Sequence, residues 1–137
     1  MKALTLQQPW ASLVAFGDKT IEFRSWQTEY RGPLLICAGS KPISDGEEIM
    51  PYGVVVALVQ LVRIEQFSAR HLEKAGFDEM PDAPGFAWHL RHAREVHPVK
   101  VKGKQRLFEL DIQAEIVDEQ EDIDHYDLFH RLMAVPA

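Results

Sequence analysis

Three charged side chains, Lys19, Glu22 and Arg24, lie close together in the stretch GDKTIEFRSW. The apolar residues Ile21 and Phe23 are two positions apart, which predicts a β-strand with one face in the core. The opposite face then carries Thr20, Glu22, Arg24 and Trp26, with Lys19 at the strand entry. An exposed ion pair between Glu22 and Arg24 contributes little to stability. The alternative is a functional groove into which these side chains point.

A lysine beside a glutamate in a partly dry groove can do two kinds of chemistry. As a binding pair, Lys19 would contact a phosphate or a base carbonyl, while Glu22 would accept a hydrogen bond from an exocyclic amine or hold Arg24. As a catalytic pair, Glu22 would activate water or Lys19 would polarise the bond being broken, which requires shifted pKa values. We favour binding.

The stretch QQPWASLVAFG predicts a helix that begins at Pro9 and ends at Gly17, because proline suits the first helical position and glycine the stop. The free N–H groups of its first turn follow a strand and can hold an anion such as a phosphate. Gln8 and Trp10 can then offer an amide and an aromatic face to a base. Trp10 is better explained as the first core residue of the helix, and the two interpretations are compatible.

A second basic stretch, HPVKVKGKQR, places Lys100, Lys102, Lys104 and Arg106 at every second position. If the segment is extended, these side chains form a stripe suited to a phosphate backbone. The alternative is an ordinary solvated face. Trp26, on the charged face of its strand, is the best candidate for stacking on a base beside that stripe.

The net charge of −6 is distributed unevenly along the chain. Residues 1–44 carry 5 Lys and Arg against 3 Asp and Glu, and residues 83–106 carry 6 against 1. Residues 45–82 and 107–137 are acidic. Because the local field decides whether a polyanion is attracted, a basic surface can exist on this acidic protein if the two basic regions meet.

Size and composition predict a single compact domain. The chain has 137 residues, of which 46% are hydrophobic and 26% charged, an ordinary globular composition. Its apolar runs are far shorter than the roughly 20 residues that span a membrane, so no membrane association is expected. A single cysteine, Cys37, fits a reducing compartment. We therefore expect a cytoplasmic protein.

No metal and no cofactor are expected. His89 and His92 face opposite ways on a predicted strand, and His125 and His130 are five residues apart on a short helix. The sequence has no glycine-rich phosphate loop of standard spacing. Ser12 lies inside a predicted helix, and we expect it to have no histidine base.

The order of elements predicts an α+β fold built on an antiparallel or mixed, barrel-like sheet with two to three short helices. Val54–Ile64 is apolar on both faces through Val59, which predicts a central strand. Arg106–Ile116 alternates cleanly and predicts a strand with Phe108, Leu110, Ile112, Ala114 and Ile116 turned inward. Other strands are expected over 2–6, 20–26, 30–39 and 86–90, and helices over 68–75 and from Asp124, the latter burying Leu128, Phe129, Leu132 and Met133.

Five segments in this order resemble the ASCH domain, a family of PUA-like β-barrels: LTLQQPWASLVAFGDKTIEFRSW, YRGPLLICAGSKP, VVVALVQLV, FAWHL and VKGKQRLFEL. The likeness runs from about Lys2 to Leu110. Its most specific motif is GxKxxExR, here Gly17, Lys19, Glu22 and Arg24. We expect an ASCH domain over residues 1–117, with an acidic turn and a short helix, residues 118–137, packed on it.

The resemblance implies a cleft that binds RNA or a nucleotide-like ligand. We expect its floor to contain Gln8, Pro9, Trp10, Lys19, Thr20, Glu22, Arg24 and Trp26, and its rim Lys100, Lys102 and Lys104. The acidic stretch from Asp118 to Asp124 is a second, weaker candidate, for a protein partner.

The alternative that the resemblance implies is a hydrolase, because some relatives deacetylate acetylcytidine and another is described as a ribonuclease. Lys19 and Glu22 would then be catalytic. The deacetylating relatives have a threonine three residues after the lysine, where this chain has Glu22. Glu73 is the only counterpart of their downstream glutamate.

Overall fold

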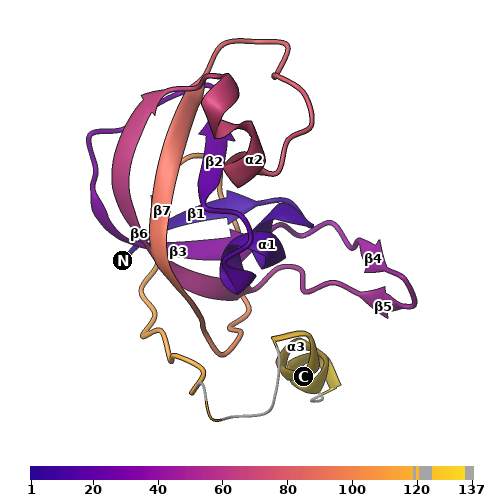
Figure 1. Ribbon diagram of the computed structural model, residues 1–137. Coiled ribbons are helices and arrows are strands. Elements are labelled where there is room, and N and C mark those ends of the chain that lie inside the picture. The colour runs from indigo at the N-terminus through magenta and orange to yellow at the C-terminus, as the bar shows by residue number, and fades with distance from the viewer. Residues whose placement is uncertain (119, 121–124, 135–137) are drawn as a thin grey trace.

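The computed structural model describes residues 1–118, 120 and 125–134 (Figure 1). The strands are β1 (Lys2–Leu6), β2 (Ile21–Arg24), β3 (Gly32–Ala38), β4 (Ser44–Asp45), β5 (Glu48–Ile49), β6 (Val55–Gln66), β7 (Phe86–Glu95) and β8 (Phe108–Glu109). The helices are α1 (Trp10–Phe16), α2 (Leu72–Ala75), which follows the 3-10 turn η1 (Ala69–His71), and α3 (His125–Ala134). None of these helices is long and apolar enough to cross a membrane.

Six strands form one curled sheet in the order β2-β7-β6-β3-β1-β8. β1 and β3 run parallel, whereas the other neighbouring pairs are antiparallel, so the sheet is mixed. The long strands β6 and β7 curve until the sheet forms a half-barrel, against which α1 packs (Figure 1). The expected α+β class, with a barrel-like mixed sheet and short helices, is confirmed.

The first half of β6 is buried on both faces, as its apolar run predicts. Val56 and Val59 pack in one core cluster with Val14 of α1. Val55, whose parity is opposite to that of Val56, packs with Phe108 in a second cluster. Since β3 and β7 pair with its two edges, β6 is the central strand that the pattern predicts.

The end of α1 positions the entry of β2. Gly17 adopts the left-handed conformation (φ 84°), which glycine reaches without a steric penalty. Its N–H donates to the Val14 carbonyl, and the N–H of Lys19 donates to the Leu13 carbonyl. This turn holds Lys19 against the base of the helix before β2 begins.

The prediction of a long strand over Arg106–Ile116 is wrong, because only Phe108–Glu109 is a strand. β8 pairs with the first two residues of β1, so the residues after Leu110 run past that strand, and Ile116 pairs instead with Val96 in an isolated bridge. The alternation still describes the packing. Leu110, Ile112, Ala114 and Ile116 lie against the cluster around Phe108.

Other details also differ from expectation. β7 extends beyond FAWHL to Glu95, and the connection after β3 contains the β4–β5 hairpin. Phe129 of α3 is buried as expected, but Met133 is 41% exposed, so its expected burial is wrong. Asp124, the expected cap of this helix, lies outside the described residues.

Candidate functional site

The charged residues of the β2 motif form one continuous line. Lys19 Nζ lies 3.4 Å from Glu22 Oε1, and Arg24 Nη2 lies 3.1 Å from Glu22 Oε2. Arg24 Nη2 also donates to the Thr5 carbonyl at 2.8 Å. One carboxylate therefore pairs with two cations, and the line joins β2, at one edge of the sheet, to β1 near the other edge.

The Lys19 side chain is almost completely enclosed. The residue is 2% exposed, and its Nζ donates to the Ala75 carbonyl at 2.5 Å. The ring centres of Trp10 and Phe77 lie 5.0 and 5.2 Å from Nζ. Burial lowers the pKa of Lys19 below its ordinary 10.5, and the carboxylate of Glu22 opposes that shift. The lysine is thus fixed in place and shielded from solvent.

A cavity of about 910 Å³ opens at the end of β2, within the range of roughly 300–1,000 Å³ typical of ligand sites. Its basic residues come from both basic regions of the sequence, which therefore meet in space. Neither Asp nor Glu is part of its lining. The lining consists of Thr5, Gln7, Arg24, Trp26, Ser40, Val101, Lys102, Gly103, Lys104, Gln105 and Arg106.

Two residues of this lining have a buried polar atom without a hydrogen-bond partner among the described residues. These atoms are Thr5 Oγ1 and Arg24 Nε. An unsatisfied buried donor or acceptor costs stability, and such groups in native folds call for an explanation. A ligand that offers an acceptor to Arg24 and a polar group to Thr5 would satisfy both.

Residues 101–106, here called the basic segment, approach β1 closely at Gly103. A Cβ atom at Gly103 would lie 2.9 Å from Thr5 Oγ1, so a side chain there forces the segment or Thr5 to shift. Farther along, the Arg106 guanidinium lies 5.0 Å over the Trp26 ring, a cation–π contact. Trp26 and Arg106 together offer an aromatic and a planar cationic surface to the cavity.

Gln8, Pro9 and Trp10 lie at the start of α1. Gln8 is buried: its Oε1 accepts from the Ser12 N–H at 2.9 Å, and its Nε2 donates to the Pro51 carbonyl at 2.9 Å. Pro9 is exposed, and α1 begins one residue later, at Trp10. Trp10 packs beside Lys19, away from the lining of the cavity.

Other predicted site residues are dispersed. Thr20 is half-buried, its N–H donates to the Lys74 carbonyl, and it lines a different pocket. Lys100 pairs with Val54 in an isolated bridge and does not line the cavity. The structure thus brings Arg24, Trp26, Lys102 and Lys104 together in the cavity, supported from behind by Lys19 and Glu22.

The structure also contains a serine, histidine and carboxylate line that no local pattern reveals. Ser12 Oγ lies 3.0 Å from His125 Nε2, and His125 Nδ1 lies 2.7 Å from Glu95 Oε1. The expectation that Ser12 has no histidine partner is therefore wrong, since the two residues meet across 113 positions of sequence. Both are buried, and the amide of Gln8 also donates to Ser12 Oγ. We interpret the line as an anchor that holds α3 to α1 and β7.

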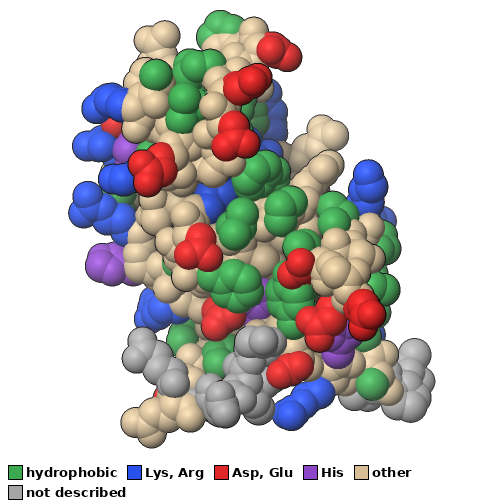
Figure 2. All heavy atoms as spheres, turned by 45° about the vertical axis from the view of Figure 1, so that its right-hand side comes forward, with side chains coloured by type: hydrophobic (Ala, Val, Ile, Leu, Met, Phe, Trp, Pro, Cys, Tyr) green, Lys and Arg blue, Asp and Glu red, His purple; other side chains and the backbone are tan. Residues whose placement is uncertain are grey.

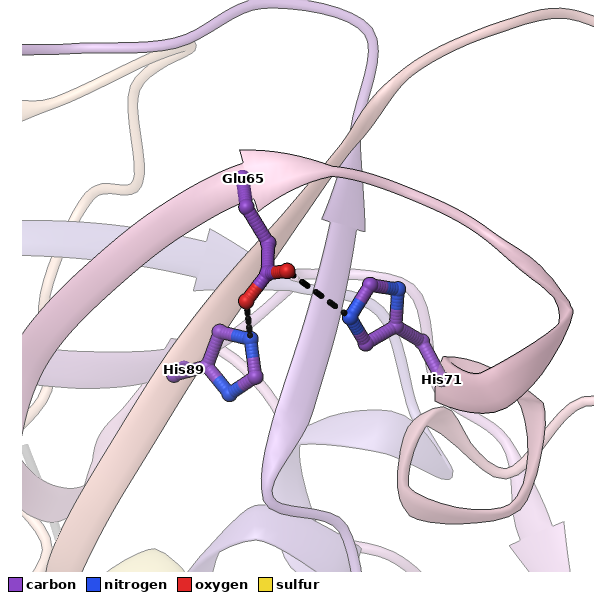
Figure 3. Close-up of side chains that lie close together, drawn as sticks. All are labelled: Glu65, His71 and His89. Carbon is purple, nitrogen blue, oxygen red and sulfur yellow. Dashed lines mark ion pairs between the residues drawn. The ribbon is translucent and has the colours of Figure 1, made fainter.

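Glu65, His71 and His89 form a further cluster that the sequence did not reveal (Figure 3). Glu65 lies between the two rings, with Oε2 2.9 Å from His89 Nε2 and Oε1 3.6 Å from His71 Nε2. The hydrogen bonding disfavours a metal ion. The Ser68 N–H donates to His71 Nδ1, which leaves the ring proton on Nε2. Two guanidinium groups already pair with the same carboxylate, so we interpret the cluster as an ion-pair network.

A comparison with protein families gives this site its context. The model of the ASCH domain family matches residues 4–100. The chain belongs to the ASCH domain family. The matched region includes the whole GxKxxExR motif and ends at Lys100, so the whole basic segment and α3 lie beyond it.

Among curated proteins, the ASCH domain is similar to activating signal cointegrator 1 of Homo sapiens and of Mus musculus. Each is 50% identical to it over 44 residues, which are 32% of this chain. The matched residues make up 8% of each relative, so the match leaves most of each longer protein uncovered.

Solved structures of the ASCH protein from Zymomonas mobilis share the fold. One crystal structure superposes with a TM-score of 0.62 at 19% identity, covering 80% of this chain and 86% of the other. A crystal structure of a mutant of that protein gives a TM-score of 0.64 at 19% identity, with 80% and 87% covered. At this identity the likeness establishes the half-barrel fold alone.

Proposed function

We propose that this ASCH domain binds RNA in the cavity bounded by β1, the end of β2 and the basic segment. The observation that carries the proposal is the lining of that cavity: four cationic side chains and a tryptophan, with no carboxylate, on a protein of net charge −6. The ASCH domain family is generally RNA-binding. A cationic groove with an aromatic platform suits single-stranded nucleic acid.

The side chains of the cavity suit different parts of an RNA, depending on how exposed they are. Lys102 and Lys104 are exposed at the mouth of the cavity and suit phosphate contacts. Trp26, with Arg106 beside it, suits stacking on a base. Arg24 Nε and Thr5 Oγ1 lie deeper, where their missing hydrogen bonds suit a base edge or a ribose hydroxyl.

Lys19 and Glu22 act behind the cavity as positioning residues. Glu22 accepts from Arg24 and holds its guanidinium on the carbonyl of Thr5. Lys19 balances the second oxygen of the carboxylate. The motif therefore fixes the orientation of one arginine, and the arginine faces the RNA.

The experiment is a fluorescence-anisotropy titration of a labelled single-stranded RNA of about 10 nucleotides at salt concentrations from about 50 to 200 mM. We expect binding that weakens steeply with salt and is weakened further by Lys102→Ala. Trp26→Ala should weaken it by about 5- to 150-fold, equal to roughly 1–3 kcal/mol for one stacked base. Lys41→Ala, an exposed lysine outside the cavity, is the matched control for Lys102→Ala. Absent binding, or binding that ignores both salt and Lys102→Ala, contradicts the proposal.

A hydrolase acting on a modified nucleoside or on RNA is the second candidate. The observation in its favour is Lys19, whose lowered pKa and nearby carboxylate resemble a catalytic pair. Its enclosure by Trp10, Phe77 and the Ala75 carbonyl favours the positioning role instead. Incubation with acetylcytidine and with labelled RNA separates the two: turnover that is lost in Lys19→Met supports the enzyme.

A further inference from the structure

A second basic groove lies beside β7, between β6, the start of β2 and α2. Its volume is about 550 Å³, and its lining includes no Asp or Glu. None of its lining residues belongs to the RNA cavity. Figure 2 shows Lys and Arg side chains gathered along the left-hand edge of the molecule, with acidic side chains spread over the face in front. The titratable residues of the groove's lining are Arg63, Lys74, His89, Arg91 and His92, together with Lys19, whose side chain is only 1% exposed.

The backbone of β7 is distorted where it borders this groove. Arg91 pairs with Gln60 and Arg94 with Leu58, so two residues of β7 stand opposite one residue of β6. His92, within this bulge, adopts φ 54°, a conformation that costs free energy for any residue other than glycine. Consecutive residues of a regular strand point to opposite faces, but the bulge lets both Arg91 and His92 line the groove.

The ion-pair network of Figure 3 fixes one wall of the groove. Glu65 Oε2 lies 3.0 Å from Arg63 Nε and 2.9 Å from His89 Nε2. The Arg63 side chain is still 59% exposed, and its Nη2 lies 3.4 Å from His89 Nε2. On the other side, the Lys74 carbonyl accepts from the Thr20 N–H at 3.0 Å, which ties α2 to the entry of β2. The side chains of Arg63 and His89, and the backbone that carries Lys74, are therefore positioned before any ligand arrives.

We propose that this groove binds phosphate groups of an RNA strand, an inference that rests on the proposed RNA-binding function. Guanidinium, ammonium and imidazole donors match phosphate oxygens, and the lining contains no carboxylate that would repel them. The groove and the RNA cavity lie at the two ends of β2, since Thr20 lines one and Arg24 the other. A strand of this length spans roughly 13 Å, a distance that a few nucleotides can cover. A longer RNA can therefore occupy both sites.

The test compares RNA lengths in two double variants with equal charge. Lys74→Ala with Arg91→Ala removes two cations of the groove, and Lys41→Ala with Arg131→Ala removes two exposed cations elsewhere. For an RNA of about 15 nucleotides we expect on the order of tenfold weaker binding in the groove variant and a salt slope shallower by about 1.4, or roughly 0.7 for each lost phosphate contact. An RNA of about four nucleotides, which fills only the cavity, should bind the groove variant and the wild type with equal affinity.

His92→Gly separates backbone strain from function. Glycine accepts the left-handed conformation, so the fold should be as stable as the wild type or more stable. Affinity for the longer RNA should nevertheless fall, because the imidazole donor is lost. Unchanged affinity for the longer RNA in both groove variants overturns the proposal, and if Trp26→Ala still weakens binding, the proposed function of the cavity stands.

If the wild type binds neither RNA, the proposed function fails and the groove is tested by itself. An NMR titration with inorganic phosphate then follows the backbone amides of Arg91 and His92. Saturable shifts that disappear in the groove variant support a phosphate site without RNA specificity. The absence of shifts at these amides overturns it.

Discussion

The entry of β2 and the basic segment are both rich in cations, yet their environments are opposite. The Lys19 side chain is 1% exposed and lies against Glu22, whose side chain is 9% exposed. Lys102 and Lys104 are exposed, and no described residue forms an ion pair with them. Removing a charge from water is costly unless it is paired, so the buried pair maintains the shape of the site. The positive charges of the exposed lysines are not neutralised by a described carboxylate and can attract an anionic ligand.

This difference separates stability from binding within a single site. A change in the buried line should alter folding first and binding through the position of Arg24. A change in the basic segment should alter binding and its salt dependence while the fold remains stable. Three predictions test this division.

The largest effect is expected from Glu22→Ala, which leaves Lys19 buried without its counter-charge. Removing one partner of a buried ion pair costs about 3–5 kcal/mol, and urea denaturation should show a loss of this size in the free energy of unfolding. Glu29→Ala, the loss of an exposed carboxylate in the following loop, should change it by less than about 0.5 kcal/mol. Equal effects of the two substitutions would mean that the buried pair does not support the fold.

An intermediate effect, on binding rather than folding, is expected from Gly103→Ala. The new Cβ overlaps Thr5 Oγ1, so the basic segment must move away from β1 and the cavity changes shape. We expect RNA affinity to fall about tenfold, equal to roughly 1.4 kcal/mol. Gly39→Ala is the matched control, because its Cβ would make only ordinary contacts of 3.7 Å or more. Wild-type affinity in Gly103→Ala would show that the close approach is unimportant for binding.

The smallest effect is expected in the pH dependence of stability. The pKa of Lys19 is lowered in the folded state, mainly by burial, so the unfolded chain binds more protons between that lowered value and 10.5. Lys19 therefore raises the free energy of unfolding as pH rises through this window, by at most about 1.4 kcal/mol per pH unit. Lys19→Met should lack this gain. Burial also raises the pKa of Cys37, to about 12. Because Cys37 is present in both proteins, its contribution cancels in the difference between their stability curves. Parallel stability curves for the two proteins would contradict the environment assigned to Lys19.

The sequence was informative where local pattern and packing agree. The alternation of Ile21 and Phe23 correctly predicted that both pack in a core cluster, and the apolar run of β6 correctly predicted a central strand. Parity also predicted the packing of the residues after Phe108, although not their loss of strand pairing. That loss arises because β8 runs antiparallel to β1 and reaches Lys2, the first residue of β1, at Glu109, which no pattern within the segment records.

The sequence was uninformative where distant residues meet. His125 reaches Ser12 and Glu95 only because α3 docks on α1, and Glu65 gathers two histidines from η1 and β7. The enclosure of Lys19 depends likewise on Phe77 and Ala75, which follow it by more than fifty positions. Charge at the start of β2 was visible in the sequence, whereas its burial was a property of the fold.

The most direct test of RNA binding in the cavity is an NMR titration of the ¹⁵N-labelled ASCH domain with single-stranded RNA. The account predicts the largest shifts at the indole N–H of Trp26 and at the backbone amides of residues 101–106, with α3 unaffected. Shifts confined to α3 or to the β4–β5 hairpin, or no shifts at all, would contradict it.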